Sequence, residues 1–168
     1  TEISKIADDR LLEYLIHRYR YEIYPETKKL DKYPPYVQIE PSSICNYRCV
    51  FCFETDPTFT KKSNGHMGSM KLELFKDIVD MLHNKVEFIG LASRGEPLAC
   101  KDIDAMLDYT NNKFLSLKIN TNASLLTEKK CHAILSGGVS TLVFSVDAAE
   151  SKLYSKLRVN GKLEVVLK

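Results

Sequence analysis

The sequence lacks the features of membrane, secreted and strongly charged proteins. None of its apolar runs approaches the roughly 20 residues that span a bilayer. The amino-terminal residues lack the basic and apolar regions of a signal peptide. The net charge is only +2, from 24 basic and 22 acidic side chains, which gives no field that would attract nucleic acid. We therefore expect a cytoplasmic protein with no membrane partner, and the charge argues against nucleic acid.

Cysteine is also scarce, and its distribution argues against a disulfide framework. The chain has five cysteines, an odd number, and three of them fall within residues 45–52. Such a cluster suits a reducing compartment and metal binding better than paired disulfides. The remaining composition, 44% hydrophobic and 27% charged, is that of an ordinary globular domain.

Helical and strand patterns alternate along the chain. After a lead-in helix from about Ser4 to Arg20, Pro25, Pro34 and Pro35 predict a connector before the first strand. Strands are predicted at 36–40, 86–91, 115–120 and 141–145, and helices at 70–83, 102–111, 127–136 and 149–157. The later strands start 29 and 26 residues apart, which is the size of a βαβ unit. This spacing predicts an α/β fold with parallel strands.

One segment breaks this alternation. Residues 41–69 have no convincing period, and they are far more numerous than the 2–6 residues of a usual βα loop. The segment leaves the carboxyl end of the first strand, where parallel α/β proteins place their ligands. We therefore expect this loop to be functional.

The loop carries the strongest motif in the sequence. Residues 45–52 read CNYRCVFC, so that Cys45, Cys49 and Cys52 have CxxxCxxC spacing. Structural zinc normally takes four protein ligands, and no fourth cysteine or histidine lies at zinc-finger spacing. Three cysteines on a four-iron cluster leave one iron open, and an open coordination site is what chemistry at a metal requires.

This motif resembles that of the radical S-adenosylmethionine (radical SAM) superfamily, CxxxCxΦC with Φ aromatic, and Phe51 fills the aromatic position. Residues 94–97, RGEP, are similar to the family's GGEP motif, with Arg94 in place of the first glycine. Residues 120–123, NTNA, are similar to its TNG segment, with Ala123 in place of glycine. The resemblance covers about residues 36–168.

The resemblance implies a set of cofactor contacts. Cys45, Cys49 and Cys52 would bind a 4Fe-4S cluster, and the turn with Gly95 and Glu96 would receive the amino group of SAM. Ser145 and Asp147 would contact the ribose, and Arg158 the SAM carboxylate. Each residue also has an ordinary structural interpretation, because glycine and proline form turns, Ser145 or Asp147 can cap a helix, and arginine is usually solvated.

The resemblance further implies an enzyme with a partial (β/α) TIM-like barrel. We count about four of the family's six βα units, so we expect residues 1–35 to be a helix and connector and residues 36–168 the amino-terminal part of the barrel. SAM would be cleaved to a 5′-deoxyadenosyl radical that abstracts a hydrogen from a peptide, protein or small-molecule substrate. An electron donor such as flavodoxin or ferredoxin would reduce the cluster. Relatives with these motifs often carry a cysteine-rich SPASM extension.

Two alternatives remain open at this point. The first is a non-catalytic module that holds zinc or a cluster, which metal analysis after anaerobic purification would reveal. The second is a radical SAM enzyme that modifies RNA, which steeply salt-dependent RNA binding would indicate.

Overall fold

Four parallel strands form the main sheet of the computed structural model, which describes residues 3–6, 8–92 and 94–168. Their order is β1-β3-β4-β5, and every neighbouring pair is parallel. Their bounds are Tyr36–Ile39 for β1, Phe88–Leu91 for β3, Ser116–Thr121 for β4 and Thr141–Phe144 for β5. The predicted α/β class with parallel strands is thus confirmed, and the arrangement is consistent with part of a TIM-like barrel.

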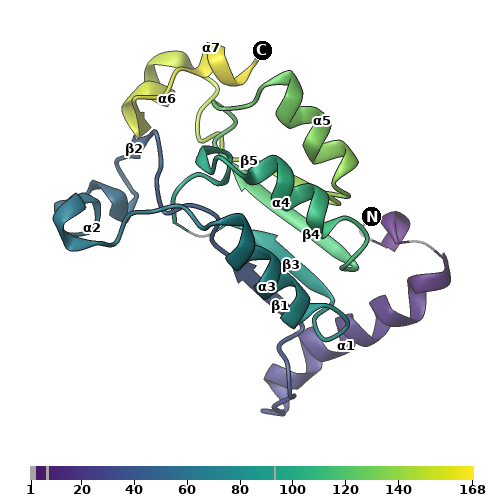
Figure 1. The fold of residues 1–168 in the computed structure, drawn as a ribbon. Helices are drawn as coiled ribbons and strands as arrows, with labels where there is room; N and C mark the ends of the chain where they lie inside the picture. The colour runs from purple at the N-terminus through teal and green to yellow at the C-terminus, as the bar shows by residue number, and fades with distance from the viewer. Residues whose placement is uncertain (1–2, 7, 93) are drawn as a thin grey trace.

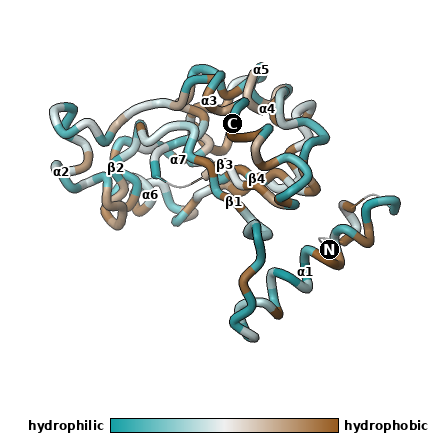
Figure 2. Tube along the Cα trace, turned by 60° about the horizontal axis from the view of Figure 1, so that its bottom comes forward, coloured by the Kyte–Doolittle hydropathy of each residue, from teal (hydrophilic) through white to brown (hydrophobic). Residues whose placement is uncertain are grey.

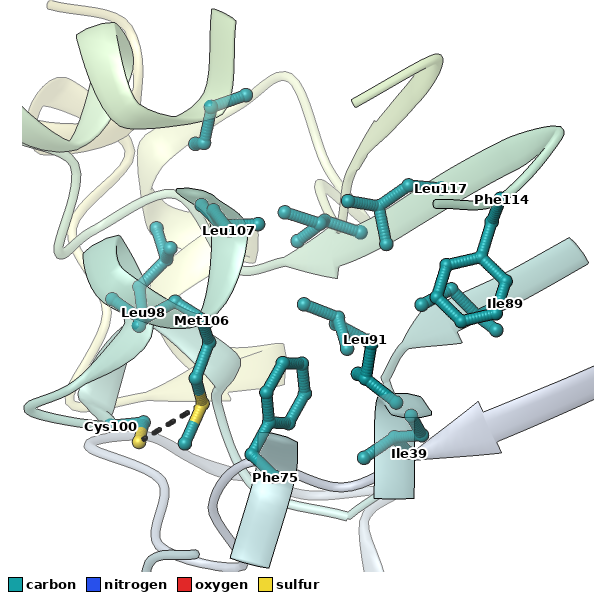
Figure 3. Close-up of a cluster of buried hydrophobic side chains, with 14 of the residues drawn as sticks. Ile39, Phe75, Ile89, Leu91, Leu98, Cys100, Met106, Leu107, Phe114 and Leu117 are labelled. Atoms are coloured by element: carbon teal, nitrogen blue, oxygen red, sulfur yellow. Dashed lines mark hydrogen bonds between the residues drawn. The ribbon is translucent and has the colours of Figure 1, made fainter. Parts of the chain in front are cut away.

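Helices between the strands cover one face of this sheet (Figure 1). They are α3 (Leu72–Leu82), α4 (Ile103–Thr110) and α5 (Glu128–Ser136). Alternate strand residues point into the core between sheet and helices, where Leu91 lies near Phe75 and Met106 (Figure 3). Cys100 is buried in the same core, with its sulfur 4.0 Å from that of Met106. It is therefore a packing residue here.

The lead-in helix α1 (Leu11–Glu26) lies across the end of the sheet at which the strands begin (Figures 1 and 2). Its His17 ring stacks on Phe88 at the start of β3, with ring centroids 3.8 Å apart. The side chain of Arg10 donates a hydrogen bond to the carbonyl of Phe114, just before β4. Both contacts fix the helix against strand starts, opposite to the end that carries the cysteine loop.

The bounds of α1 differ from the prediction at both ends. Two 3-10 turns, Ile3–Lys5 and Asp8–Arg10, precede the helix, and it continues past Arg20 to Glu26. Pro25 was expected to interrupt the chain, but it lies inside the last turn of α1. A proline there removes one backbone donor near the helix end and leaves the preceding turns intact. The expectation that the helix ends at about Arg20 and that Pro25 belongs to the connector was therefore wrong.

The segment between β1 and α3 contains short elements that the sequence did not predict. These are β2 (Arg48–Cys49), the 3-10 turns η3 (Phe53–Thr55) and η4 (Lys62–Asn64), and α2 (Pro57–Thr60). The strand β2 pairs antiparallel with β6 (Arg158–Val159), which follows α6 (Ser151–Leu157). A last short helix, α7 (Leu163–Val166), packs Leu163 into a second core with Tyr47 and Tyr154.

Within the described residues, no helix combines the length and the apolar composition that a membrane crossing requires.

Candidate cofactor site

A cavity of about 400 Å³ opens at the carboxyl ends of the strands. All three motif cysteines line it, together with residues that follow β3, β4 and β5. These neighbours include Gly95, Glu96, Asn122, Ser145 and Arg158. The structure therefore brings every predicted site residue except Asp147 to one cavity.

The cysteine loop is held closed at its base. The Met70 amide donates to the carbonyl of Pro41 over 2.8 Å, and the Ser43 amide donates to that of Gly68 over 2.9 Å. Ser42 and Ser69 form a β-bridge beside them. The two ends of residues 41–70 thus meet.

The β2–β6 ribbon anchors the middle of the loop. Cys49 lies opposite Arg158 in this ribbon, and the guanidinium Nη1 is 3.6 Å from the Cys49 Sγ. Burial raises the pKa of the Cys49 thiol, and the positive charge of Arg158 opposes that rise. Arg158 is therefore placed to stabilise a thiolate at Cys49.

Cys45 has a different set of donors. The Tyr47 amide lies 3.4 Å from its sulfur, and the Asn122 side-chain amide lies 3.8 Å from it. Burial raises the pKa of the Cys45 thiol to about 11. Metal ligands must be deprotonated, so metal binding at this residue would release a proton.

The three thiols are free and do not converge on one point. Among the described residues, no three His, Cys, Asp or Glu side chains are close enough to share a single metal ion. A cluster binds each thiolate through a different iron, so it needs thiols that surround a larger volume than one ion occupies. Free thiols around an open cavity fit the ligand set of such a cluster.

A buried carboxylate, Glu54, joins the cysteine loop to the Gly95 turn. Its side chain is 1% exposed, and Oε1 accepts a hydrogen bond from the Gly95 amide over 2.8 Å. Oε2 lies 3.3 Å from the Arg48 guanidinium. Sequence reasoning missed Glu54, because a glutamate in a loop without period carries no signal of burial.

Gly95 is required by the backbone at this turn. Its φ is +65°, and a Cβ built on it would lie 2.2 Å from the carbonyl oxygen of Ser42. Only glycine tolerates both the left-handed conformation and the close approach. The turn therefore packs directly on the base of the cysteine loop.

Arg94 stands where the GGEP motif has its first glycine, and its side chain binds Glu40. Its guanidinium forms a two-pronged contact with Glu40, with Nε 3.1 Å from Oε2 and Nη2 3.0 Å from Oε1. Its backbone amide also donates to Glu40 Oε2. The substitution thus ties this turn to the end of β1.

The Glu96 carboxylate accepts hydrogen bonds from the protein at most of its acceptor positions. It is 2% exposed and accepts from Thr121 Oγ1 at 2.6 Å, from the Asn122 amide at 2.7 Å and from the Leu98 amide at 3.1 Å. Burial raises its pKa, and these donors oppose the rise. A carboxylate offers about four acceptor positions, so one is left after these three bonds, and Glu96 lines the cavity.

Two predicted residues, Asp147 and Arg158, contact each other. Asp147 forms an ion pair with the Arg158 guanidinium and does not line the cysteine cavity. Arg158 is 8% exposed, and its guanidinium also lies over the Phe51 ring. Ser145 lines the cavity after β5, and its amide donates to the carbonyl of Thr121.

The segment after β4 contributes Asn122, which belongs to the part of the sequence that is similar to the TNG segment. Its side-chain nitrogen donates to Asn46 Oδ1 over 3.0 Å, and its side-chain oxygen accepts a hydrogen bond from the backbone amide of Ser124. The following Ala123 has φ +63°, in the region that glycine favours. The backbone therefore keeps the conformation of a glycine turn even though alanine occupies it.

Comparison with protein-family models matches residues 39–168 to the Radical SAM superfamily. Among curated proteins, GTP 3′,8-cyclase of Clostridium botulinum (strain Hall) is 29% identical over 140 residues, which are 79% of this chain and 41% of the cyclase. The S-adenosyl-L-methionine-dependent 2-deoxy-scyllo-inosamine dehydrogenase of Niallia circulans is 29% identical over 146 residues, 82% of this chain and 56% of that enzyme. The chain thus spans about half or less of these relatives.

Solved structures agree with this match. BtrN in complex with AdoMet and 2-DOIA superposes with a TM-score of 0.60 and 25% identity, over 72% of this chain and 49% of BtrN. Streptococcus suis SuiB bound to its precursor peptide SuiA gives a TM-score of 0.64 at 21% identity, over 93% of this chain and 33% of SuiB. The second likeness concerns the fold alone. Neither comparison identifies a SPASM extension, which stays a prediction.

Proposed function

This chain belongs to the radical SAM superfamily, and from that premise we propose that it is the cofactor-binding part of an enzyme that generates a radical from SAM. Members of the superfamily use a 4Fe-4S cluster and SAM. The observation that carries the proposal is that three free thiols and the Gly95-Glu96 turn line one cavity at the carboxyl ends of parallel strands. That is the edge at which such folds place their chemistry.

Cys45, Cys49 and Cys52 are the ligands that would hold the cluster. The Tyr47 amide at Cys45 and the Arg158 guanidinium at Cys49 place partial and full positive charge beside two of the sulfurs. Both favour the thiolate form that binds iron. The chemistry supplied by a bound cluster and SAM is reductive cleavage of SAM to a 5′-deoxyadenosyl radical, which abstracts a hydrogen from the substrate.

The SAM contacts are proposed from the polar groups that line the cavity. The remaining acceptor position of Glu96 suits the amino group, while Gly95 lets the backbone approach the ligand. The Ser145 hydroxyl suits a ribose hydroxyl, and the Arg158 guanidinium suits the carboxylate. Asp147 would act indirectly, because its carboxylate orients Arg158.

Further βα units are expected to complete the barrel beyond residues 36–168, with residues 1–35 as a separate helix and connector. The outer edge of β5 pairs with no other strand of the described chain, and Phe144 at its end is half exposed. The matched regions are also only 41% and 56% of the two curated relatives. Completion of the barrel would cover that edge.

The enzyme would need a low-potential reductant, such as flavodoxin or ferredoxin, and a reducing cytoplasmic environment that keeps its five thiols free.

A peptide, protein or small molecule would be its substrate. The named relatives act on different substrate classes, and SuiB is bound to a peptide. RNA is less suitable, since the net charge is only +2.

The test is 5′-deoxyadenosine formation. The chain is reconstituted anaerobically with iron and sulfide, reduced with dithionite and given SAM, and the products are separated by chromatography. The expected result is an amount of 5′-deoxyadenosine above that of a control in which Cys45, Cys49 and Cys52 are all replaced by alanine. Zinc without iron after anaerobic purification, or a cluster-loaded longer protein that never cleaves SAM, would contradict the proposal.

A further inference from the structure

The inner face of the sheet, opposite to α3, α4 and α5, carries a row of polar residues. The buried residues of β4, Leu117 and Ile119, pack in the core, so Lys118 and Asn120 face the other way. The strand register places Lys118 between Gly90 of β3 and Thr141 of β5, and Gly90 is paired in turn with Gln38 of β1. We call Gln38, Gly90, Lys118 and Thr141 the inner row.

Tyr36 adds a hydroxyl group to the inner row. A Cβ at Gly90 would lie 2.0 Å from the phenolic oxygen of Tyr36, so this hydroxyl occupies the space above Gly90. Neighbouring strands are about 4.8 Å apart, which puts the Tyr36 hydroxyl beside the strand that carries Lys118. The row thus combines an ammonium, a hydroxyl and the Gln38 amide.

The charge of Lys118 is not neutralised by the described part of the chain. No hydrogen bond or ion pair of its ammonium is found among the described residues. The cavity of about 290 Å³ that it lines also contains Arg18, His17 and three aromatic rings, and no carboxylate. Arg18 pairs with Glu22 on its own helix. A half-buried lysine without a counter-charge attracts an anion.

The inner row adjoins the cofactor cavity at Gln38. Gln38 and Asn120 line that cavity, and Asn120 follows Lys118 by two residues on β4. Two strand residues span about 6.6 Å. A ligand whose anionic end contacts Lys118 would therefore extend its other end to the level of Asn120, under the cysteines.

We propose that the inner row anchors the substrate, and that the substrate carries a carboxylate or phosphate group bound by Lys118. This rests on the function proposed above and adds a substrate class to it. The Tyr36 hydroxyl and the Gln38 amide would donate to the same anionic end. Asn120 would bind a neutral polar part nearer to the reacting carbon.

The test uses the full 168-residue chain without a cluster, labelled with ¹⁵N. Inorganic phosphate and malonate are titrated separately at constant ionic strength, and amide chemical shifts are followed by NMR. We expect saturable shifts at Gly90, Lys118 and Thr141, and at least tenfold weaker binding in Lys118→Met. Lys101→Met, an exposed lysine on a turn, is the matched control and should bind like the parent chain. Tighter phosphate or tighter malonate binding indicates which anionic group the substrate carries.

Shifts that do not saturate, shifts confined to other parts of the chain, or equal binding by Lys118→Met would overturn the proposal. If Lys118→Met fails to fold, Lys118→Gln replaces it, and the position of the shifts in the parent chain already decides the site. The titration needs neither cluster nor SAM. Its failure therefore leaves the proposed radical chemistry untouched, whereas anion binding without any SAM cleavage would count against that chemistry alone.

Discussion

At the scale of single residues, the Gly95 turn depends on the absence of a side chain. Gly95→Ala would lower the unfolding free energy in two ways, through strain at the left-handed φ of +65° and through a clash of the new Cβ, 2.2 Å from the Ser42 carbonyl oxygen. Gly65 has a similar φ of +71° but has open space where a Cβ would lie, so Gly65→Ala would cause the strain only. We expect a loss of about 1 kcal/mol in unfolding free energy for Gly65→Ala and about 3 kcal/mol or more for Gly95→Ala. Urea denaturation measures both, and equal losses would show that the turn does not pack on Ser42.

The cysteines allow an equally direct comparison. Cys45→Ala should abolish iron and sulfide incorporation, because it removes one of three cluster ligands. Cys131, an exposed residue of α5, is the matched control, and Cys131→Ala should retain the parent iron content. Iron and sulfide analysis after anaerobic reconstitution checks the prediction. Unchanged iron in Cys45→Ala would remove Cys45 from the ligand set.

At the scale of elements, Glu54 connects the cysteine loop to the Gly95 turn, which lies 41 residues further along the sequence. Glu54→Ala would leave the Gly95 amide without its acceptor and the Arg48 guanidinium without its counter-charge. We expect a loss of about 1–3 kcal/mol in unfolding free energy, and faster proteolysis within residues 56–66.

The control for Glu54 is Glu73→Ala, which also removes one carboxylate. The Glu73 side chain is 82% exposed, and its one ion pair within the described residues is with Lys76 on the same helix, so its loss should change stability by less than about 0.5 kcal/mol. Limited proteolysis and thermal unfolding should separate the two variants. Identical cleavage rates would mean that Glu54 does not hold the cysteine loop.

The main elements could be predicted from the sequence because their signals are local. Apolar periodicity and glycine stops placed the four strands and the helices between them close to their observed positions. The antiparallel ribbon of β2 and β6 could not be predicted, since each strand has two residues and its partner lies far along the chain. The motif likewise indicated Cys49, whereas the contact between Cys49 and Arg158 is a property of the folded ribbon.

Burial was less accessible to sequence reasoning than element type. Leu12, Leu15 and Ile16 recur at the helical spacing that predicts α1, and all three are exposed. The packed side of the helix carries Tyr14 and His17 instead, because aromatic stacking on Phe88 fixes its orientation. A helical period identifies a helix but does not determine which face meets the sheet.

At the scale of the whole molecule, the main sheet of the described chain has an edge strand on each side, β1 and β5, and each of these has one partner. β3 and β4 have partners on both sides, while β5 pairs only with β4 in the described chain. Alternate amides of β5 therefore point away from any ladder partner, and we expect their hydrogen exchange to be much faster than that of β3 amides. Exchange measured by NMR or mass spectrometry tests this. Full protection along β5 would show that another strand, from a second molecule, covers the edge.

The β2–β6 ribbon also sets an order of events during synthesis. Arg158 leaves the ribosome 109 residues after Cys49, and at about 5–20 residues per second that interval lasts about 5–20 s. During this time the cysteine motif is already outside the ribosome, but its charged neighbour and its anchoring strand do not yet exist. Assembly of the finished thiol site therefore waits until Arg158 has emerged, and the nascent motif is open to oxidation and to binding of other metals during that interval.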